Sequence, residues 1–227
     1  AQAENLVVLF GSEGLGLKES AALAQACANL LVITEHVNRP NNGLIGVWSR
    51  ANDQGAYEIG LRPLSDLMGA IQNAKALYVA GADPAGDDPA LVDAIKSTGF
   101  LVVQELFLTE TAKLADVVLP VLPFTEREGS FTSGERRVQR FYPAVLAKGE
   151  ARADFMITGQ ISQLAGVQTE TNSAARVFTQ LAAKVSAFNG LTFRQLAQVH
   201  EQWPLVGRSD VYYGGTAYDN QQGLGAH

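Results

Sequence analysis

The sequence predicts an α/β fold: an open, mostly parallel sheet with helices on both faces, followed by a helical and irregular C-terminal part. Short apolar runs such as Leu6–Phe10 stop at a glycine, which is typical of strands buried in a parallel sheet. Segments rich in helix formers separate these runs, and strand–helix–strand units cross over right-handed into parallel sheets. The 227 residues, 47% of them hydrophobic and 18% charged, suffice for a substantial core.

The first strand–helix–strand unit is expected to be a strand at Leu6–Phe10, a helix at Lys18–Asn29 and a strand at Leu31–Thr34. The helix is Ala-rich and carries apolar residues on one side. The next segment, residues 36–61, is rich in Asn and Gly and shows no clear periodicity. So long a stretch without regular elements is unusual in a compact domain unless it is functional or packs on a partner.

The second half of the sheet is predicted from five apolar or periodic segments. They are a helix around Leu64–Asn73, a strand at Ala76–Gly81, a helix at Ala90–Ser97 opened by Pro89, and strands at Phe100–Leu106 and Ala115–Pro123. After Phe124 the chain is polar and irregular, and further helices are expected at Asp154–Leu164, Ser173–Ala187 and Phe193–His200, before a Gly-rich tail extended over the surface. We therefore place a domain boundary between residues 1–123 and residues 124–227.

Composition excludes several classes of function. The formal net charge of −6 argues against nucleic acid as a partner, because such binding needs clustered Lys and Arg. No apolar run approaches the length of a bilayer-spanning helix, so direct membrane insertion is not expected, and the N-terminus does not look like a signal peptide. The single cysteine, Cys27, can supply neither an internal disulfide nor an iron–sulfur ligand set, which favours a reducing compartment. His36, His200 and His227 are too scattered for a metal site.

The turn Gly11–Gly16 follows the first expected strand and invites comparison with a dinucleotide-binding loop. Glycines at this place let the backbone approach a diphosphate, and Glu35 lies near where a ribose-binding acid would be. The spacing does not match Gly-x-Gly-x-x-Gly, and Glu13 adds negative charge beside the phosphates. A plain tight turn is favoured over a nucleotide-binding module, which stays an alternative.

Two polar turns lie at expected strand ends, where α/β sheets place ligands. The first is Gly81-Ala82-Asp83-Pro84, in which Asp83 could cap the next segment and Pro84 fixes the backbone. The second contains Thr109, Glu110, Thr111 and Lys113. Glu110 and Lys113 could form an acid–base pair, but their three-residue separation suits ordinary neighbours on a helix surface equally well.

A longer motif, which includes the second polar turn, resembles a known protein family. Residues 100–139, FLVVQELFLTETAKLADVVLPVLPFTEREGSFTSGERRVQ, closely resemble the central signature of the molybdopterin oxidoreductase superfamily. The Gly-Ala-Asp-Pro turn resembles its Gly-x-Asn-Pro turn, and NNGLIGVWSRANDQGAYEIGL resembles its Gly- and Asn-rich stretch. Within the superfamily the sequence looks most like the large iron–sulfur subunit of respiratory complex I, a likeness that the tail YYGGTAYDNQQGLG supports.

The resemblance implies candidate cofactor residues. In molybdenum and tungsten members, pterin guanine dinucleotides are gripped by turns at strand ends, and one such turn resembles Gly81, Ala82, Asp83 and Pro84. By the same resemblance, Thr109, Glu110 and Thr111 match another region near the site. Three departures make a bound molybdopterin unexpected. Asp83 replaces an Asn and would repel a diphosphate, while Ser133 and Arg136 replace the Asn and Gly of the family's Asn-x-Glu-Gly-Arg segment. No residue matches a catalytic or metal-ligand position.

On the complex I interpretation, the chain is a non-catalytic scaffold that supports electron transfer from NADH to quinone. The 2Fe–2S and 4Fe–4S clusters of such a subunit would lie elsewhere in the parent protein, and other peripheral-arm subunits would be its partners. The location implied is the cytoplasmic side of the bacterial plasma membrane, or the matrix side of the inner membrane in mitochondria. The main alternative is a fragment of an active molybdopterin oxidoreductase such as a formate dehydrogenase.

A local cluster of positive charge, Arg136, Arg137 and Arg140, stands out in an acidic chain. It is either a solvated basic face or a docking site for an acidic neighbour. The solvated face is favoured, because exposed charges usually contribute little to stability.

Overall fold

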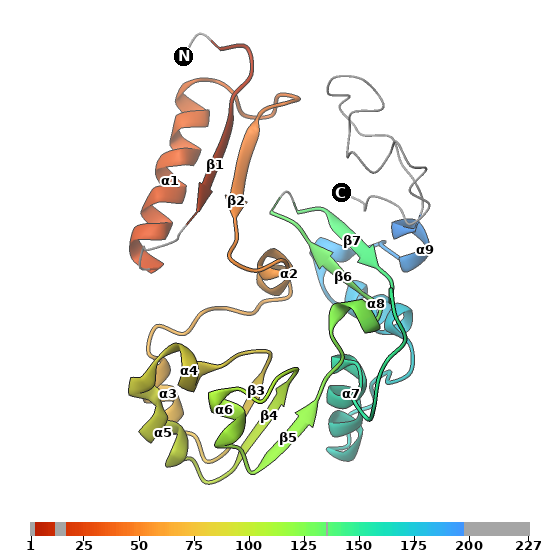
Figure 1. The fold of residues 1–227 in the computed structure, drawn as a ribbon. Coiled ribbons are helices and arrows are strands. Elements are labelled where there is room, and N and C mark those ends of the chain that lie inside the picture. Colours follow the sequence, from red (N-terminus) through yellow and green to blue (C-terminus); the bar gives the residue numbers. More distant parts are fainter. Residues whose placement is uncertain (1–2, 12–16, 135, 198–227) are drawn as a thin grey trace. The chain divides into compact units, whose positions relative to one another are not determined.

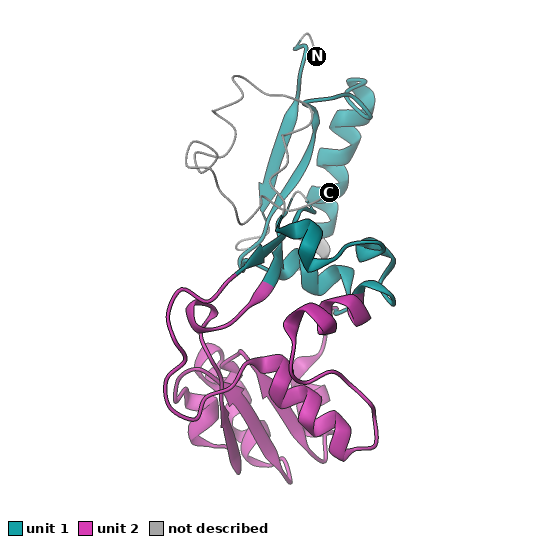
Figure 2. Ribbon diagram, turned by 90° about the vertical axis from the view of Figure 1, so that its right-hand side faces the viewer, with its two compact units in different colours: residues 1–61, 130–141, 182–227 teal, residues 62–129, 142–181 magenta. Residues whose placement is uncertain are grey.

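The computed structural model describes residues 3–11, 17–134 and 136–197. The glycine-rich turn after Gly11, Glu13, His200, His227 and the predicted extended tail lie outside these residues. The chain divides into two compact units. Unit 1 comprises residues 1–61, 130–141 and 182–227, and unit 2 comprises residues 62–129 and 142–181 (Figure 2). The predicted domain boundary at residue 123 stays a prediction, because two units that each have many internal contacts need not be domains that fold independently.

Unit 1 begins with a parallel pair of strands, β1 (Val7–Gly11) and β2 (Gly43–Val47), in register from Val7 opposite Gly43 to Gly11 opposite Val47. Helix α1 (Leu17–Ile33) packs alongside both strands (Figure 1). The side chains of Val7 and Leu9 share one face of β1 and are exposed. The predicted parallel strand at Leu6–Phe10 is confirmed, but its predicted burial is wrong, because one face of β1 is exposed.

The predicted strand at Leu31–Thr34 is wrong, because α1 continues through it to Ile33. The helix ends in a Schellman motif, in which the N–H of Glu35 donates to Val32 O at 3.1 Å and that of His36 to Leu31 O at 2.9 Å. Glu35 takes the left-handed position with φ 57°, so it terminates a helix and does not close a strand. An apolar run this short carries no periodicity that separates helix from strand.

The Asn- and Gly-rich stretch is not structureless, as it supplies β2 and the short helix α2 (Asp53–Glu58). Later parts of the chain complete unit 1. They are the strand pair β6 (Gly129–Thr132) and β7 (Val138–Phe141), the short 3-10 helix η3 (Ser186–Phe188) and helix α9 (Phe193–Leu196). The rings of Phe131 and Phe141 stack across β6 and β7 with centroids 4.6 Å apart.

Unit 2 is built on a three-stranded parallel sheet in the order β3 (Leu77–Ala80), β4 (Leu101–Glu105), β5 (Val117–Pro120). Its other elements are short except for α7. They are α3 (Leu67–Gln72), α4 (Pro84–Asp87), η1 (Pro89–Leu91), α5 (Val92–Lys96), α6 (Glu110–Lys113), η2 (Phe124–Glu126), α7 (Asp154–Leu164) and α8 (Ala174–Ala182).

The two faces of this sheet are covered differently. Leu101 and Val103 of β4 point into an apolar core shared with α3, α4, α5 and α6. Gln104 points to the opposite face, where its side chain reaches Asp154 at the start of α7. The predicted α/β class, with parallel strands and helices on both faces, is therefore confirmed, and α7 has the predicted bounds. None of the described helices is long and apolar enough to cross a membrane.

Candidate functional site

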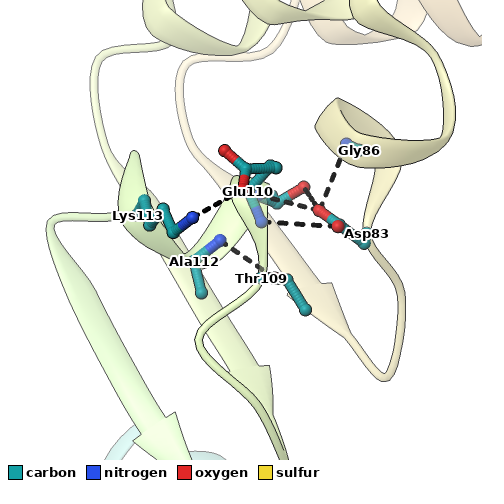
Figure 3. Close-up of polar contacts among 7 residues, drawn as sticks. Asp83, Gly86, Thr109, Glu110, Ala112 and Lys113 are labelled. Atoms are coloured by element: carbon teal, nitrogen blue, oxygen red, sulfur yellow. Dashed lines mark hydrogen bonds and ion pairs between the residues drawn. The ribbon is translucent and has the colours of Figure 1, made fainter.

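The two polar turns singled out in the sequence meet at the carboxyl ends of β3 and β4 (Figure 3). The turn Gly81–Pro84 follows β3, and the segment Thr109–Thr111 follows β4 and opens α6. Gly81 adopts φ 61°, and its N–H donates to Gln104 O at 3.0 Å, which continues the ladder into the turn. The parallel order of the strands brings both turns to the same edge.

Asp83 ties these two turns together. Its Oδ1 accepts hydrogen bonds from the Thr111 hydroxyl at 2.7 Å and the Thr111 N–H at 2.8 Å. The same atom receives the N–H of Gly86 at 3.3 Å, which caps α4, whereas Oδ2 receives only the N–H of Glu110 at 3.3 Å. We call this set of contacts the Asp83 brace. The residue that was expected to repel a ligand is thus engaged with the protein's own backbone.

Thr111 completes the brace from the other side. Its side chain is fully buried, and its Oγ1 accepts the N–H of Ala85 at 2.9 Å while its hydroxyl proton is donated to Asp83. These hydrogen bonds, chiefly those from the Thr111 hydroxyl and N–H, hold the pKa of Asp83 below its usual range. The carboxyl group is therefore ionised at neutral pH.

Glu110 and Lys113 form an ordinary surface ion pair. Lys113 Nζ lies 2.5 Å from Glu110 Oε1, and the two side chains are 51% and 62% exposed. Thr109 begins this helix by accepting the N–H of Ala112 at 3.2 Å. The structure supports the helix-neighbour alternative, because the two residues form an exposed i,i+3 ion pair.

A second polar cluster in unit 2 was not predicted from the sequence. The fully buried side chain of Gln104 donates to Asp154 Oδ1 at 2.8 Å and accepts a hydrogen bond from the Tyr78 hydroxyl. Asp154 also faces Arg127 Nε at 3.4 Å. Burial, with a smaller contribution from the negative charge of Asp154, raises the pKa of Tyr78. A lone Gln inside an apolar strand was the available signal for this cluster.

In unit 1 the structure contains a cavity of about 500 Å³ at the carboxyl end of β2. It is lined by the continuous segment Ile45–Ala51 together with Ser133, Gly134 and Gln139 from the β6–β7 hairpin. Trp48 and Arg50 lie within that segment, which belongs to the Asn- and Gly-rich stretch. No site residues were predicted within that stretch, so the cavity was missed. Only folding brings the hairpin to the strand end.

The turn of that hairpin is closed by two backbone hydrogen bonds. The N–H of Ser133 donates to Arg137 O at 2.9 Å, and that of Arg136 to Ser133 O at 2.8 Å. Arg136 has φ 64°, the conformation for which the family's Gly is suited. Its Nε donates to Glu58 Oε1 at 2.7 Å, while Ser133 Oγ is buried without a hydrogen-bond partner.

Exchanging Arg136 for glycine or alanine separates backbone strain from the ion pair. Both changes remove the contact with Glu58, but only alanine keeps a Cβ in the left-handed conformation. We expect the glycine variant to be more stable than the alanine variant by about 1 kcal/mol. Urea unfolding of the two proteins measures the difference, and equal midpoints would show that the turn relaxes without strain.

The three arginines do not form a solvated face, so that prediction is wrong. Arg137 is buried, with 5% of its surface exposed. The half-buried Arg140 donates to Phe193 O at 3.2 Å, and its guanidinium lies 4.8 Å from the centre of the Phe193 ring. Arg136 alone is well exposed. Arg136 and Arg140 make contacts within unit 1.

His36 is buried beside the end of α1, with Nδ1 2.8 Å from Thr34 Oγ1 and Nε2 3.0 Å from Ala3 O. Among residues 3–11, 17–134 and 136–197 the structure brings together no group of three His, Cys, Asp or Glu side chains suited to a metal. Both ring nitrogens of His36 are engaged, which gives this residue a structural role.

Comparison with known proteins gives the family. Residues 1–164 match the family described as molybdopterin oxidoreductase. The chain is 33% identical over 218 residues to the F420-dependent formate dehydrogenase 2 subunit alpha of Methanococcus maripaludis, covering 79% of this chain and 32% of the relative. It is 26% identical to formate dehydrogenase H of Escherichia coli, covering 96% of this chain and 36% of the relative. The chain thus spans about a third of the length of these relatives.

These relatives correct the functional expectation. The assignment to the large subunit of respiratory complex I, with its scaffold role, is contradicted by similarity over most of the chain to formate dehydrogenase subunits. The expectation that molybdopterin is unlikely is corrected as well, because the family implies that cofactor in the parent protein. The superfamily resemblance in residues 100–139 is confirmed, and the chain belongs to the molybdopterin oxidoreductase family.

Proposed function

We propose that this chain is part of the catalytic subunit of a formate dehydrogenase-like molybdopterin oxidoreductase. The observation that carries the proposal is similarity to formate dehydrogenase subunits over 79% to 96% of the chain. The reaction is the oxidation of formate to carbon dioxide with release of one proton and two electrons. When bound, a molybdopterin cofactor supplies the metal centre that takes up these electrons.

The strand edge at Gly81–Pro84 does not fit a cofactor phosphate. The N–H groups of Gly86, Glu110 and Thr111, which could have received an anion, already donate to the ionised carboxylate of Asp83. A phosphate next to this carboxylate would be repelled. We therefore derive no phosphate contact from Gly81, Ala82, Asp83, Pro84, Thr109, Glu110 or Thr111. Their part in the proposed enzyme is to hold the ends of β3 and β4 together.

The cavity of unit 1 fits part of such a cofactor better. Its lining residues include Arg50, Gln139 and Ser49, residue types whose side chains can donate hydrogen bonds to an anionic ligand. Ser133, from the same lining, carries a buried hydroxyl without a hydrogen-bond partner. A buried polar atom of this kind is uncommon in proteins and points to a group that would satisfy it.

Formate oxidation by the parent protein tests the proposal. The parent subunit, produced anaerobically and loaded with cofactor, is given formate and the one-electron dye benzyl viologen. We expect formate-dependent reduction of two dye molecules for each carbon dioxide released. A preparation made without molybdate or tungstate is the control. Full cofactor loading with no dye reduction above the control would refute the proposed activity, whatever the cavity binds.

A further inference from the structure

The cavity of unit 1 contains an aromatic side chain held in a fixed place. Trp48 is 44% exposed, and its indole lies against the backbone of two glycines. A Cβ on Gly46 would be 3.6 Å from indole Cε2 and Nε1, and one on Gly134 would be 3.5 Å from Cδ1. A Cβ on Gly134 would also clash with Gly46 O, so only glycine allows the hairpin to approach β2 this closely. The β6–β7 hairpin and β2 therefore pack against the indole ring and hold it in place.

A chain of hydrogen bonds fixes the orientation of this ring. The indole Nε1 donates to Gln54 Oε1 at 3.1 Å, and Gln54 Nε2 donates to Glu58 Oε1 at 2.7 Å. Arg136 Nε donates to the same Glu58 oxygen at 2.7 Å. Gln54 is buried and Glu58 is only 13% exposed. The chain thus runs from the hairpin turn through α2 to Trp48, and it uses the indole N–H without using the π-face of the ring.

A fixed, half-exposed aromatic ring is suited to stacking. Base–aromatic stacking contributes about 1–3 kcal/mol per ring and tolerates different heterocycles. The charged and amide groups of the lining are suited to the remainder of such a ligand: Arg50 to an anionic group and Gln139 to the amide-like edge of a heterocycle. A purely structural Trp would be expected to be buried in an apolar core, whereas Trp48 is 44% exposed and lines the same cavity as Ser49 and Arg50.

We propose that Trp48 is the stacking platform for a 2-amino-4-oxopyrimidine-fused ring, the ring system that pterin and guanine share. Gln54 is a positioning residue that acts through the indole N–H. The inference rests on the proposed function in so far as a pterin cofactor supplies such a ring. Beyond the proposed function, the inference assigns Trp48 as the residue that contacts the ring and Gln54 as the residue that positions Trp48. It is not tied to formate, so it can hold even where the parent enzyme oxidises another substrate.

Fluorescence of the chain tests this directly, because Trp48 and Trp203 are its two tryptophans. Trp203, which lies outside the described residues, is replaced by Phe to leave Trp48 as the reporter. We expect GMP, 6-biopterin or both to quench this emission with a saturable dependence on concentration. The Trp48→Phe protein, in which Trp203 reports, is the matched control for non-specific quenching and for light absorbed by the pterin. Circular dichroism melts establish that each variant is folded.

Affinity measured by equilibrium dialysis distinguishes a binding residue from a structural one. Trp48→Ala is expected to weaken binding of the ring about tenfold, whereas Trp48→Phe retains a stacking face and loses less. Gln54→Met leaves the indole in place but removes its acceptor, and it is expected to raise the accessibility of Trp48 to acrylamide while weakening binding severalfold. If Trp48→Ala does not fold, the affinities of the Trp48→Phe and Gln54→Met proteins, compared with that of the unmodified protein, show whether Trp48 binds the ring.

Each outcome has a clear meaning. Saturable quenching by GMP alone assigns the ring to a guanine, and quenching by 6-biopterin alone assigns it to a pterin. No saturable quenching by either compound up to about 10 mM, beyond the weakest affinities of specific sites, overturns the inference. Equal affinity of the Trp48→Phe, Gln54→Met and unmodified proteins would also overturn it. Formate-dependent dye reduction in the parent protein is read separately, so each proposal can fail alone.

Discussion

Replacing Asp83 with alanine is expected to lower the free energy of unfolding by about 2–4 kcal/mol. The change removes the acceptor of four hydrogen bonds that join the end of β3 to α4 and α6. Loss of a helix cap costs about 0.5–2 kcal/mol, and each buried donor left without a partner adds about 1–3 kcal/mol. The fully buried Thr111 hydroxyl is the group most affected. Urea unfolding followed by circular dichroism measures the loss.

Asp83→Asn is the matched control for this prediction. Its Oδ1 can keep the three contacts that Asp83 Oδ1 makes, and only the weaker contact of Oδ2 with the Glu110 N–H is lost. We expect a loss below about 1 kcal/mol. A loss equal to that of the alanine variant would show that charge, and not the geometry of Oδ1, holds the turns together.

The brace also gives stability a dependence on pH. Because the folded state lowers the pKa of Asp83, its contribution is present above the unfolded pKa of about 4 and is lost as the pH falls through the lower folded value. Thermal melts between about pH 2 and pH 6 should therefore show a larger loss at acid pH for the unmodified protein than for Asp83→Asn. Parallel curves would mean that Asp83 titrates alike in both states.

Replacing Gln104 with glutamate is expected to cost about 3 kcal/mol at neutral pH. The new carboxylate would be buried and would face Asp154 Oδ1, to which the Gln104 amide now donates at 2.8 Å. Burial and a like charge both raise the pKa of a carboxyl group, and a pKa that is higher by about 2 corresponds to about 2.7 kcal/mol. The cost should fall below about pH 5, because a protonated carboxyl group can donate to Asp154 as the amide does.

Gln104→Leu is the control, since it removes the same hydrogen bonds without adding a charge. We expect it to cost about 1–2 kcal/mol, because Asp154 retains Arg127 and the partly exposed Tyr78 can bond to water. Its cost relative to the unmodified protein should change little between about pH 5 and pH 8. If Gln104→Glu showed the same flat profile, the contact between β4 and α7 would have to open on substitution.

The sequence determined much of unit 2. The apolar runs after Leu77 and Leu101 are strands, α7 begins at Asp154 as predicted, and the two polar turns lie at strand ends. These features depend on local patterns of apolar residues, capping residues and turns, which a single sequence records. The motif at residues 100–139 correctly predicted the molybdopterin oxidoreductase superfamily. It did not predict which members the chain most resembles, because the complex I assignment is contradicted by the formate dehydrogenase relatives.

Other features were decided only by tertiary structure. The run after Leu30 has the composition of a strand, yet it ends a helix because α1 packs along β1 and β2. Asp83 looked like a charge set against a ligand, and it is instead bonded to a turn that follows the next strand. Trp48 gains its setting from Gly134, far along the chain. In each case the contact joins residues that are distant in sequence. Local propensity could not predict such contacts, because they form only when the folded chain brings the two segments together.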